Sequence, residues 1–325
     1  MLFETMEVLI KGIIVVLVLF GAAAYMTFCE RVIMAYMQLR LGPNRVGPLG
    51  LLQPIADGIK LLTKESFQPA NVDKFTYWLA PAISIFTALF VFVLIPIGGY
   101  VDIGGHQVRL QIADINAGVL FLLSISSLAV YGIVLSGWAS NNRYSLLGGL
   151  RGTAQIISYE IPMGLSLLTV VLSAGTMSLS GIVDAQASQW FVWTNPISFI
   201  IYLITAFAET NRAPFDLPEA EQELTGGYHT EYGGLKFAIF FMAEYINILA
   251  VSSIAVTLFF GGWHGPGNIP VVWYLLKVAL FVFLFIWVRS TMARLRYDQL
   301  MSFGWKFLLP VAILNLIITA YFILV

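Results

Sequence analysis

Four glutamates beside or within long apolar stretches are the side chains best suited to chemistry in this sequence. Glu160 and Glu244 each interrupt an apolar run. Glu30 and Glu209 each stand at the end of one. Ionisable groups in such surroundings are costly and usually face a cavity or an ion path, where a carboxyl group can exchange protons. The alternative for Glu160 and Glu244 is a structural hydrogen bond to a Tyr, Ser or Asn of a neighbouring helix. The alternative for Glu30 is a simple pair with Arg31.

A block of carboxylates lies in the segment 214–223, whose sequence is Pro-Phe-Asp-Leu-Pro-Glu-Ala-Glu-Gln-Glu. Its acidic residues are Asp216, Glu219, Glu221 and Glu223, and Glu231 follows just beyond. In a helix, Glu219 and Glu223 share one face at i, i+4 and repel each other when both are ionised. Such repulsion raises carboxyl pKa values, which suits proton exchange. The alternative is a solvated acidic loop that docks a basic partner.

A basic, turn-rich loop runs over residues 40–48, with the sequence Arg-Leu-Gly-Pro-Asn-Arg-Val-Gly-Pro. The glycines and prolines around Asn44 and Arg45 predict tight turns. The loop suits a fixed docking surface, or arginines placed over a cavity. The alternative is the ordinary basic decoration found beside membrane spans.

Several kinds of redox or nucleotide site are excluded within this chain. The histidines, His106, His229 and His264, fall in predicted loops, so no apolar run offers a haem ligand. Cys29 is the single cysteine, which excludes an internal disulfide and a cysteine-ligated cluster. The sequence contains no phosphate-binding P-loop motif. Any redox centre must therefore belong to other chains.

The elements that must position these residues are membrane spans. Of the 325 residues, 59% are hydrophobic and 11% are charged, whereas an average soluble domain has roughly 25% charged residues. Apolar runs of about 20 residues, enough to cross a bilayer, occur at 8–29, 77–98, 115–138, 152–177, 189–210, 236–262, 270–289 and 305–325. We predict a single integral membrane domain over residues 1–325, all-α, with about eight transmembrane helices.

The segment 48–64 has a different pattern. Its apolar residues recur near helical spacing, and Gln53, Asp57, Lys60 and Lys64 take the other side. This pattern is typical of an amphipathic helix that lies in the membrane surface.

Basic residues predict the orientation. Alternate loops, beginning with the loop after the first span, hold 14 of the 17 Lys and Arg, and only Lys11, Arg109 and Lys277 lie elsewhere. Since basic loops face the cytoplasm, both termini are expected outside. Glu160 and Glu244 then lie roughly 12–13 Å below the cytoplasmic ends of their helices, and could face one another. From the residues alone, the chain is either a proton-coupled transporter or a proton-handling subunit of a larger machine.

Two stretches resemble the signature sequences of one family. They are Gly50-Leu-Leu-Gln-Pro-Ile-Ala-Asp-Gly-Ile-Lys60 and Pro214-Phe-Asp-Leu-Pro-Glu-Ala-Glu-Gln-Glu223, and they resemble the NuoH/ND1 family, the quinone-site membrane subunit of respiratory complex I. Flanking segments are similar to the family too: 30–31, 41–47, 208–212, 241–245 and 296–299. The resemblance extends over essentially the whole chain, and eight spans with outward termini agree with it.

The resemblance implies roles for particular residues. The quinone chamber and its neighbouring surface would include Glu30, Arg31, Arg40, Arg45 and Asp57. The proton path would include Glu160, Glu209, Asp216, Glu219, Glu221, Glu223, Glu231 and Glu244. Arg294 and Arg296 would lie at a subunit interface. No metal ligand and no complete catalytic site are expected in this chain alone.

The resemblance also implies a function, a membrane subunit of proton-pumping NADH:quinone oxidoreductase that couples quinone reduction to proton translocation. Quinone would be the substrate, and FMN and iron–sulfur clusters are expected in partner subunits. The expected partners are hydrophilic quinone-module subunits on the cytoplasmic face, antiporter-like membrane subunits and lipid, with no nucleic acid. The expected location is the bacterial cytoplasmic (inner) membrane, with a mitochondrial or plastid membrane as the alternative. A proton-coupled transporter and the equivalent subunit of a membrane-bound hydrogenase are the alternative functions.

Overall fold

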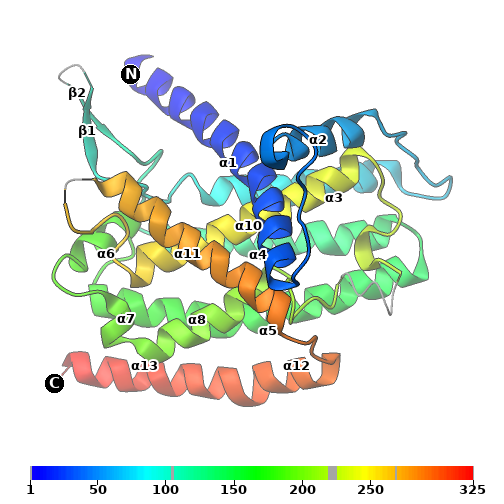
Figure 1. Cartoon of the computed structure of the whole chain (residues 1–325). Coiled ribbons are helices and arrows are strands. Elements are labelled where there is room, and N and C mark those ends of the chain that lie inside the picture. The colour runs from blue at the N-terminus through cyan, green and yellow to red at the C-terminus, as the bar shows by residue number, and fades with distance from the viewer. Residues whose placement is uncertain (1, 104–105, 219–224, 268, 325) are drawn as a thin grey trace.

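Long helices make up most of the computed structural model, which describes residues 2–103, 106–218, 225–267 and 269–324 (Figure 1). The helices that run through the bundle are α1 (Leu2–Met37), α3 (Lys74–Val91), α4 (Gly118–Ala139), α5 (Arg143–Ala174), α8 (Pro196–Glu209), α10 (Leu235–Phe259), α11 (Pro270–Thr291) and α13 (Leu309–Leu324). Shorter elements are η1 (Pro48–Gly50), α2 (Gln53–Thr63), β1 (Tyr100–Ile103), β2 (His106–Arg109), α6 (Leu179–Ala185), α7 (Phe191–Thr194), η2 (Gly227–His229), α12 (Tyr297–Phe303) and the π-helical turn η3 (Gly304–Leu308).

Local signals in the sequence explain several helix ends. Helix α5 begins after Asn142, whose side chain accepts a hydrogen bond from the backbone N–H of Tyr144 at 2.9 Å, as an N-cap does. The same helix ends at Gly175, which adopts the left-handed conformation with φ of 69°. Helices α8 and α11 both begin with a proline, at Pro196 and Pro270, where the missing N–H costs nothing.

Seven of the described helices are long and apolar enough to cross a membrane. This confirms the prediction of an all-α, multi-pass membrane protein. The segment predicted as a span at 189–210 differs from the others because it is broken at Asn195 into α7 and α8. Helix α8 has 14 residues, about 21 Å of rise, which is shorter than the roughly 30 Å of a hydrocarbon core.

The two chain ends indicate that α8 nevertheless counts as a pass. Figure 1 shows both termini at the left of the bundle, on the side of the β1–β2 hairpin and α6. A chain that starts and finishes at the same end of a bundle crosses it an even number of times, which agrees with α8 as an eighth pass beside the seven long helices. Eight membrane crossings stay a prediction. The main core lies where α5, α8 and α10 pack, around the buried Val170, Ile201 and Val256.

Helix α5 begins at Arg143, nine residues before the predicted span of 152–177. Its early turns pack against α4 through glycines: a Cβ on Gly137 would lie 2.7 Å from the Ser145 carbonyl oxygen, and Gly149 approaches Gly137 closely. Small residues of this kind let two helix backbones touch. A search for apolar runs misses such a helix start because it contains polar residues and glycines.

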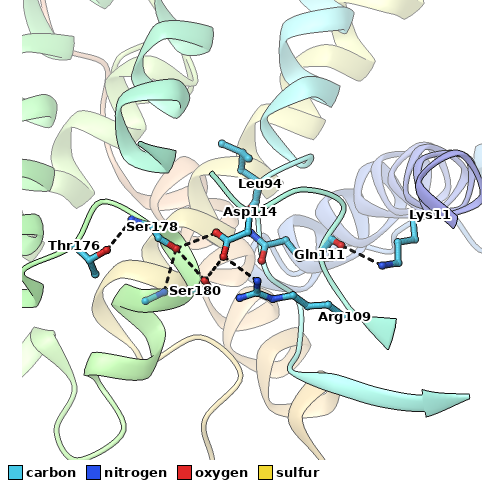
Figure 2. A network of polar contacts seen from close by, with 9 residues as sticks. Lys11, Leu94, Arg109, Gln111, Asp114, Thr176, Ser178 and Ser180 are labelled. Atoms are coloured by element: carbon cyan, nitrogen blue, oxygen red, sulfur yellow. Dashed lines mark hydrogen bonds and ion pairs between the residues drawn. The ribbon is translucent and has the colours of Figure 1, made fainter. Parts of the chain in front are cut away.

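A β-hairpin between α3 and α4 was not predicted. Strands β1 and β2 pair antiparallel, with Tyr100 opposite Arg109. Figure 2 shows how the chain beside it is held: Asp114 accepts from Arg109 at 2.9 Å, from Ser178 at 2.9 Å and from Ser180 at 2.7 Å. Burial raises the pKa of Asp114, but the Ser180 and Ser178 hydroxyls and the Arg109 charge together outweigh it and lower this pKa.

The predicted surface helix is present as η1 and α2. Its apolar residues Leu51, Ile55, Ile59 and Leu62 are exposed, as expected for a face that meets lipid. Helix α2 packs against α1. That α2 lies in the membrane surface stays a prediction.

Candidate functional site: a buried charge network beside a cavity

Glu30 lies near the end of α1 and is 3% exposed. Arg212 donates through Nη1 to Glu30 Oε1 at 3.2 Å, and Arg289 forms a close ion pair with the same oxygen. The Tyr245 hydroxyl donates to Glu30 Oε2 at 2.6 Å. One carboxylate thus links α1, α10, α11 and the segment after α8.

Arg212 extends this network to a second carboxylate. Its guanidinium forms a close ion pair with Glu244 and lies over the Tyr245 ring, 4.5 Å from the ring centroid. The formal charges of Glu30, Glu244, Arg212 and Arg289 cancel. Burying charged groups is expensive unless they are paired and hydrogen-bonded, and each carboxylate of this network has an arginine partner.

Glu244 also borders a cavity of about 80 Å³ enclosed by α3, α4, α5, α8 and α10. Glu209, at the end of α8, lines the same cavity. Polar groups around it include Ser84, Thr87, Ser126, Tyr202, Asn211 and Asn247. A water molecule needs roughly 10–15 Å³ of such space and two or more polar partners. The cavity therefore has room and hydrogen-bonding groups for several waters between the two carboxylates.

Glu160 does not line this cavity but borders a second space. Its carboxylate accepts a close hydrogen bond from Ser127, and it borders an open apolar groove between α4 and α5. Glu160 and Glu244, which were expected to be able to face one another, therefore border different spaces, and Glu209 is the carboxylate that shares a cavity with Glu244. The Ser127 hydrogen bond is also the kind of contact that the structural alternative for Glu160 required.

The acidic segment is described only in part. Asp216 is half-buried, and Leu217 and Pro218 are buried. Glu219, Glu221 and Glu223 lie outside the described residues. Beyond them, the Glu231 side chain accepts from Asn142 Nδ2 at 2.6 Å, and its backbone carbonyl accepts from the Tyr77 hydroxyl at 2.6 Å. Glu231 thus ties the chain that follows the acidic segment to α3 and to the start of α5.

Arg31, adjacent to the buried Glu30, points to a different partner. It pairs with Asp57 of α2 at 2.6 Å, and Gln53 donates to the other Asp57 oxygen at 3.0 Å. The sequence alternative of a Glu30–Arg31 pair is therefore not what is observed. Arg31 and Asp57 instead join the end of α1 to the surface helix.

The remaining predicted arginines are more exposed. Arg40 and Arg45 lie exposed in the loop after α1. This loop can fold tightly because Gly50, at φ of 79°, has no side chain. A Cβ at this position would clash with the Pro43 carbonyl oxygen. Arg296 is exposed and pairs with Asp298 at 2.6 Å. Arg294 is half-buried.

Arg212, Arg289 and Tyr245 were not singled out from the sequence, although they hold both carboxylates of the network. Arg212 and Arg289 were counted as cytoplasmic loop charges. The signal that could have identified them is their position: like Glu30 and Glu209, both arginines lie near the ends of apolar runs, where a cation can pair with a buried carboxylate. Among the residues that the structure describes, no group of three or more His, Cys, Asp or Glu side chains could hold a metal ion.

Comparisons with known proteins agree with this architecture. The family model described as NADH dehydrogenase matches residues 10–320 of this chain. The chain belongs to this family, the NuoH/ND1 membrane subunits. It is 77% identical over 306 residues, 94% of each chain, to the NADH-quinone oxidoreductase H subunit of Protochlamydia amoebophila (strain UWE25). It is 52% identical to an H subunit of the same enzyme in Geobacter metallireducens, over 97% of this chain and 96% of that one. It is 53% identical to an H subunit in Geobacter sulfurreducens, over 97% of each chain.

Proposed function

We propose that this chain is the membrane subunit of a proton-pumping NADH:quinone oxidoreductase that forms much of the quinone chamber and couples quinone reduction to proton translocation. The observation that carries this proposal is the position of Glu244. It belongs to the buried network with Arg212 and Glu30 on one side, and it lines a cavity with Glu209 on the other.

The chemistry explains why such a carboxylate matters. Reducing a quinone to a quinol consumes two electrons and two protons. Carboxylates that interact strongly titrate as a coupled set. A charge that appears near Glu30 therefore changes the proton affinity of Glu244 through Arg212, and waters in the cavity can pass the change to Glu209. Glu160 continues this order of carboxylates toward the groove on α4 and α5.

The other predicted residues complete the proposal. Glu30, Arg31, Asp57, Arg40 and Arg45 would belong to the quinone chamber and its neighbouring surface. The acidic segment, with Asp216, Glu219, Glu221, Glu223 and Glu231, would supply protons beneath that chamber.

The partners follow from the same proposal. Arg294 and Arg296 would meet hydrophilic subunits on the cytoplasmic face, and the α4–α5 groove would face further membrane subunits. FMN and iron–sulfur clusters would belong to the partners, and the assembly would lie in the bacterial inner membrane with both termini of this chain outside.

The test is Glu209→Gln in the purified complex, with Glu65→Gln as the matched control because Glu65 is exposed in the loop after α2. We expect Glu209→Gln to lower quinone-linked NADH turnover and proton pumping in liposomes at least about 10-fold. NADH oxidation by a water-soluble acceptor, which bypasses the quinone, should be unchanged. Pumping and turnover equal to those of Glu65→Gln would contradict the proposal. A chain that purifies alone and transports protons without NADH would instead favour the transporter alternative.

A further inference from the structure

Gln155 in α5 is fully buried, with 0% of its surface exposed. Its side-chain nitrogen donates to the backbone carbonyls of Ala208 and Phe215, each at 2.8 Å, and lies 3.4 Å from Asn211 Oδ1. These three groups belong to one short stretch, residues 208–215, which begins in the last turn of α8 and continues beyond it. A single amide of α5 therefore binds both ends of this stretch.

The orientation of the Gln155 amide is fixed by these contacts. Only the NH₂ group can face two carbonyl oxygens, because the amide oxygen would be repelled by both. Its oxygen, Oε1, is buried with no hydrogen-bond partner within the described part of the chain. An unpaired buried acceptor costs stability, so this glutamine is not the residue that packing alone would favour at this position.

The stretch that Gln155 holds carries two groups of the site. Ala208 precedes Glu209, and Phe215 comes three residues after Arg212. The stretch has little regular structure of its own, and Asn211 has a positive φ of 52°. Irregular backbone inside a bundle needs such partners for its polar groups.

A second contact comes from the same helix. The Tyr159 ring, one turn further along α5, packs against the Phe215 ring with centroids 5.6 Å apart. The Phe215 end of the stretch is thus held by both a hydrogen bond and a ring contact from α5.

We propose that Gln155 is a positioning residue: by holding the stretch 208–215, it places Arg212 between Glu30 and Glu244. This inference rests on the proposed function and adds to it a residue outside the charge network. Gln155 touches none of the network carboxylates. Its effect must pass through the backbone to the guanidinium.

The first test is Gln155→Met in the assembled complex, because Met keeps the approximate volume and removes both N–H donors. Gln111→Met is the matched control, since Gln111 is also buried, donates to a backbone carbonyl (Leu94, 2.7 Å) and has an unpartnered Oε1. We expect Gln155→Met to lower kcat for quinone reduction about 10-fold, with KM and the water-soluble acceptor reaction nearly unchanged. Gln111→Met should leave kcat unaltered. Equal kcat values for the two variants overturn the proposal.

The second test asks whether Gln155 acts through Arg212. Arg212→Lys keeps the positive charge but loses the planar fork that reaches both carboxylates, so its own kcat should fall. Adding Gln155→Met to Arg212→Lys should then lower kcat less than about twofold further, since coupled residues give non-additive effects. Losses that multiply mean that Gln155 acts elsewhere, and overturn the proposal.

The outcomes distinguish a failure of the proposed function from a failure of the role of Gln155. A normal kcat in Arg212→Lys contradicts the proposed function of the network. A reduced kcat in Arg212→Lys with a normal one in Gln155→Met contradicts only the role of Gln155. If Gln155→Met does not assemble, Gln155→Asn replaces it in both tests, because the shorter amide reaches at most one of the two carbonyls. Its kcat should be intermediate, and a kcat equal to that of the control overturns the proposal.

Discussion

Glu30 and Arg212 are 182 positions apart in the chain, yet a guanidinium nitrogen of Arg212 lies 3.2 Å from the Glu30 carboxylate, and both side chains are buried. Two distant segments, the end of α1 and the stretch after α8, are therefore joined by opposite charges inside the bundle. Removing one member of a buried ion pair lowers stability much more than replacing both members with apolar residues, because it leaves an unpaired buried charge. This asymmetry makes the network open to direct testing.

Glu30→Gln removes the anion that faces Arg212 and Arg289. We expect the folded protein to lose about 3–5 kcal/mol of stability, and quinone-linked turnover of the assembled fraction to fall. Thermal unfolding of the detergent-solubilised complex and NADH:quinone assays would measure both. The control is Glu7→Gln, at the other end of α1, where an i, i+4 pair with Lys11 is worth roughly 0–1 kcal/mol. Similar effects at the two positions would show that the Glu30 network adds nothing.

Glu209 and Glu244 share a cavity, so their effects on pumping should not be independent. Gln at either position keeps the size and hydrogen bonding of the side chain but removes its titration. We expect the double variant to be little worse than the worse single one. Adding Glu160→Gln tests whether the path continues to the α4–α5 groove. If the losses from Glu209→Gln and Glu244→Gln simply multiply, the cavity does not connect them.

Glu219 and Glu223 lie outside the described residues, and their prediction rests on their i, i+4 spacing. Replacing both with Gln should lower quinone reduction while the water-soluble acceptor reaction persists. Glu65→Gln, exposed in the loop after α2, is a suitable control for removal of a loop charge. Normal quinone reduction in the double variant would leave this segment as a docking element.

Asp114→Asn should destabilise the hairpin end of the bundle by about 1–2 kcal/mol, because the carboxylate accepts hydrogen bonds from Ser178, Ser180 and Arg109. Since the folded-state pKa of Asp114 is lowered, its ionised form contributes stability above the unfolded value of about 3.9. That contribution is lost as pH falls through the lower folded-state pKa. The difference in unfolding free energy between Asp114→Asn and the unmodified protein should therefore be constant from roughly pH 5 to 8. It should shrink below about pH 4. Asp102→Asn, exposed on β1, should show neither effect in the same melting experiments.

The orientation of the chain can be tested with reporter fusions after Val325 and near Gly226. Eight passes and basic cytoplasmic loops predict that the two reporters lie on opposite sides of the membrane. A reporter at Met1 should match the one after Val325. Two reporters on the same side, at Val325 and Gly226, would contradict the eight-pass arrangement.

The sequence predicted the parts of this fold that depend on composition. Apolar runs located the long helices, and the alternation around Asp57 and Lys60 located helix α2. The early start of α5 was missed because glycine packing, as at Gly137 and Gly149, does not depend on apolar character. The hairpin was missed because its strands are four residues long.

The site was predicted less completely for a different reason. Glu30, Glu209 and Glu244 could be found because a carboxylate beside an apolar run is unusual. Their cations were missed, because Arg212 and Arg289 stand near helix ends where basic residues are common. Depth along a helix was also a poor guide to contact: Glu160 and Glu244 have similar spacing from basic residues, but the faces of α5 and α10 that carry them border different spaces.

The short α8 has a consequence for how this protein is made. With 14 residues, it falls below the roughly 17–25 that a stand-alone span needs to partition into lipid, and Asn195 separates it from α7. Helix α8 packs along α5, which precedes it in the chain and is already synthesised when α8 leaves the ribosome. We therefore expect entry of α8 into the bilayer to depend on docking to α5, so that a lesion in the face of α5 that packs on α8 lowers the amount of correctly inserted protein.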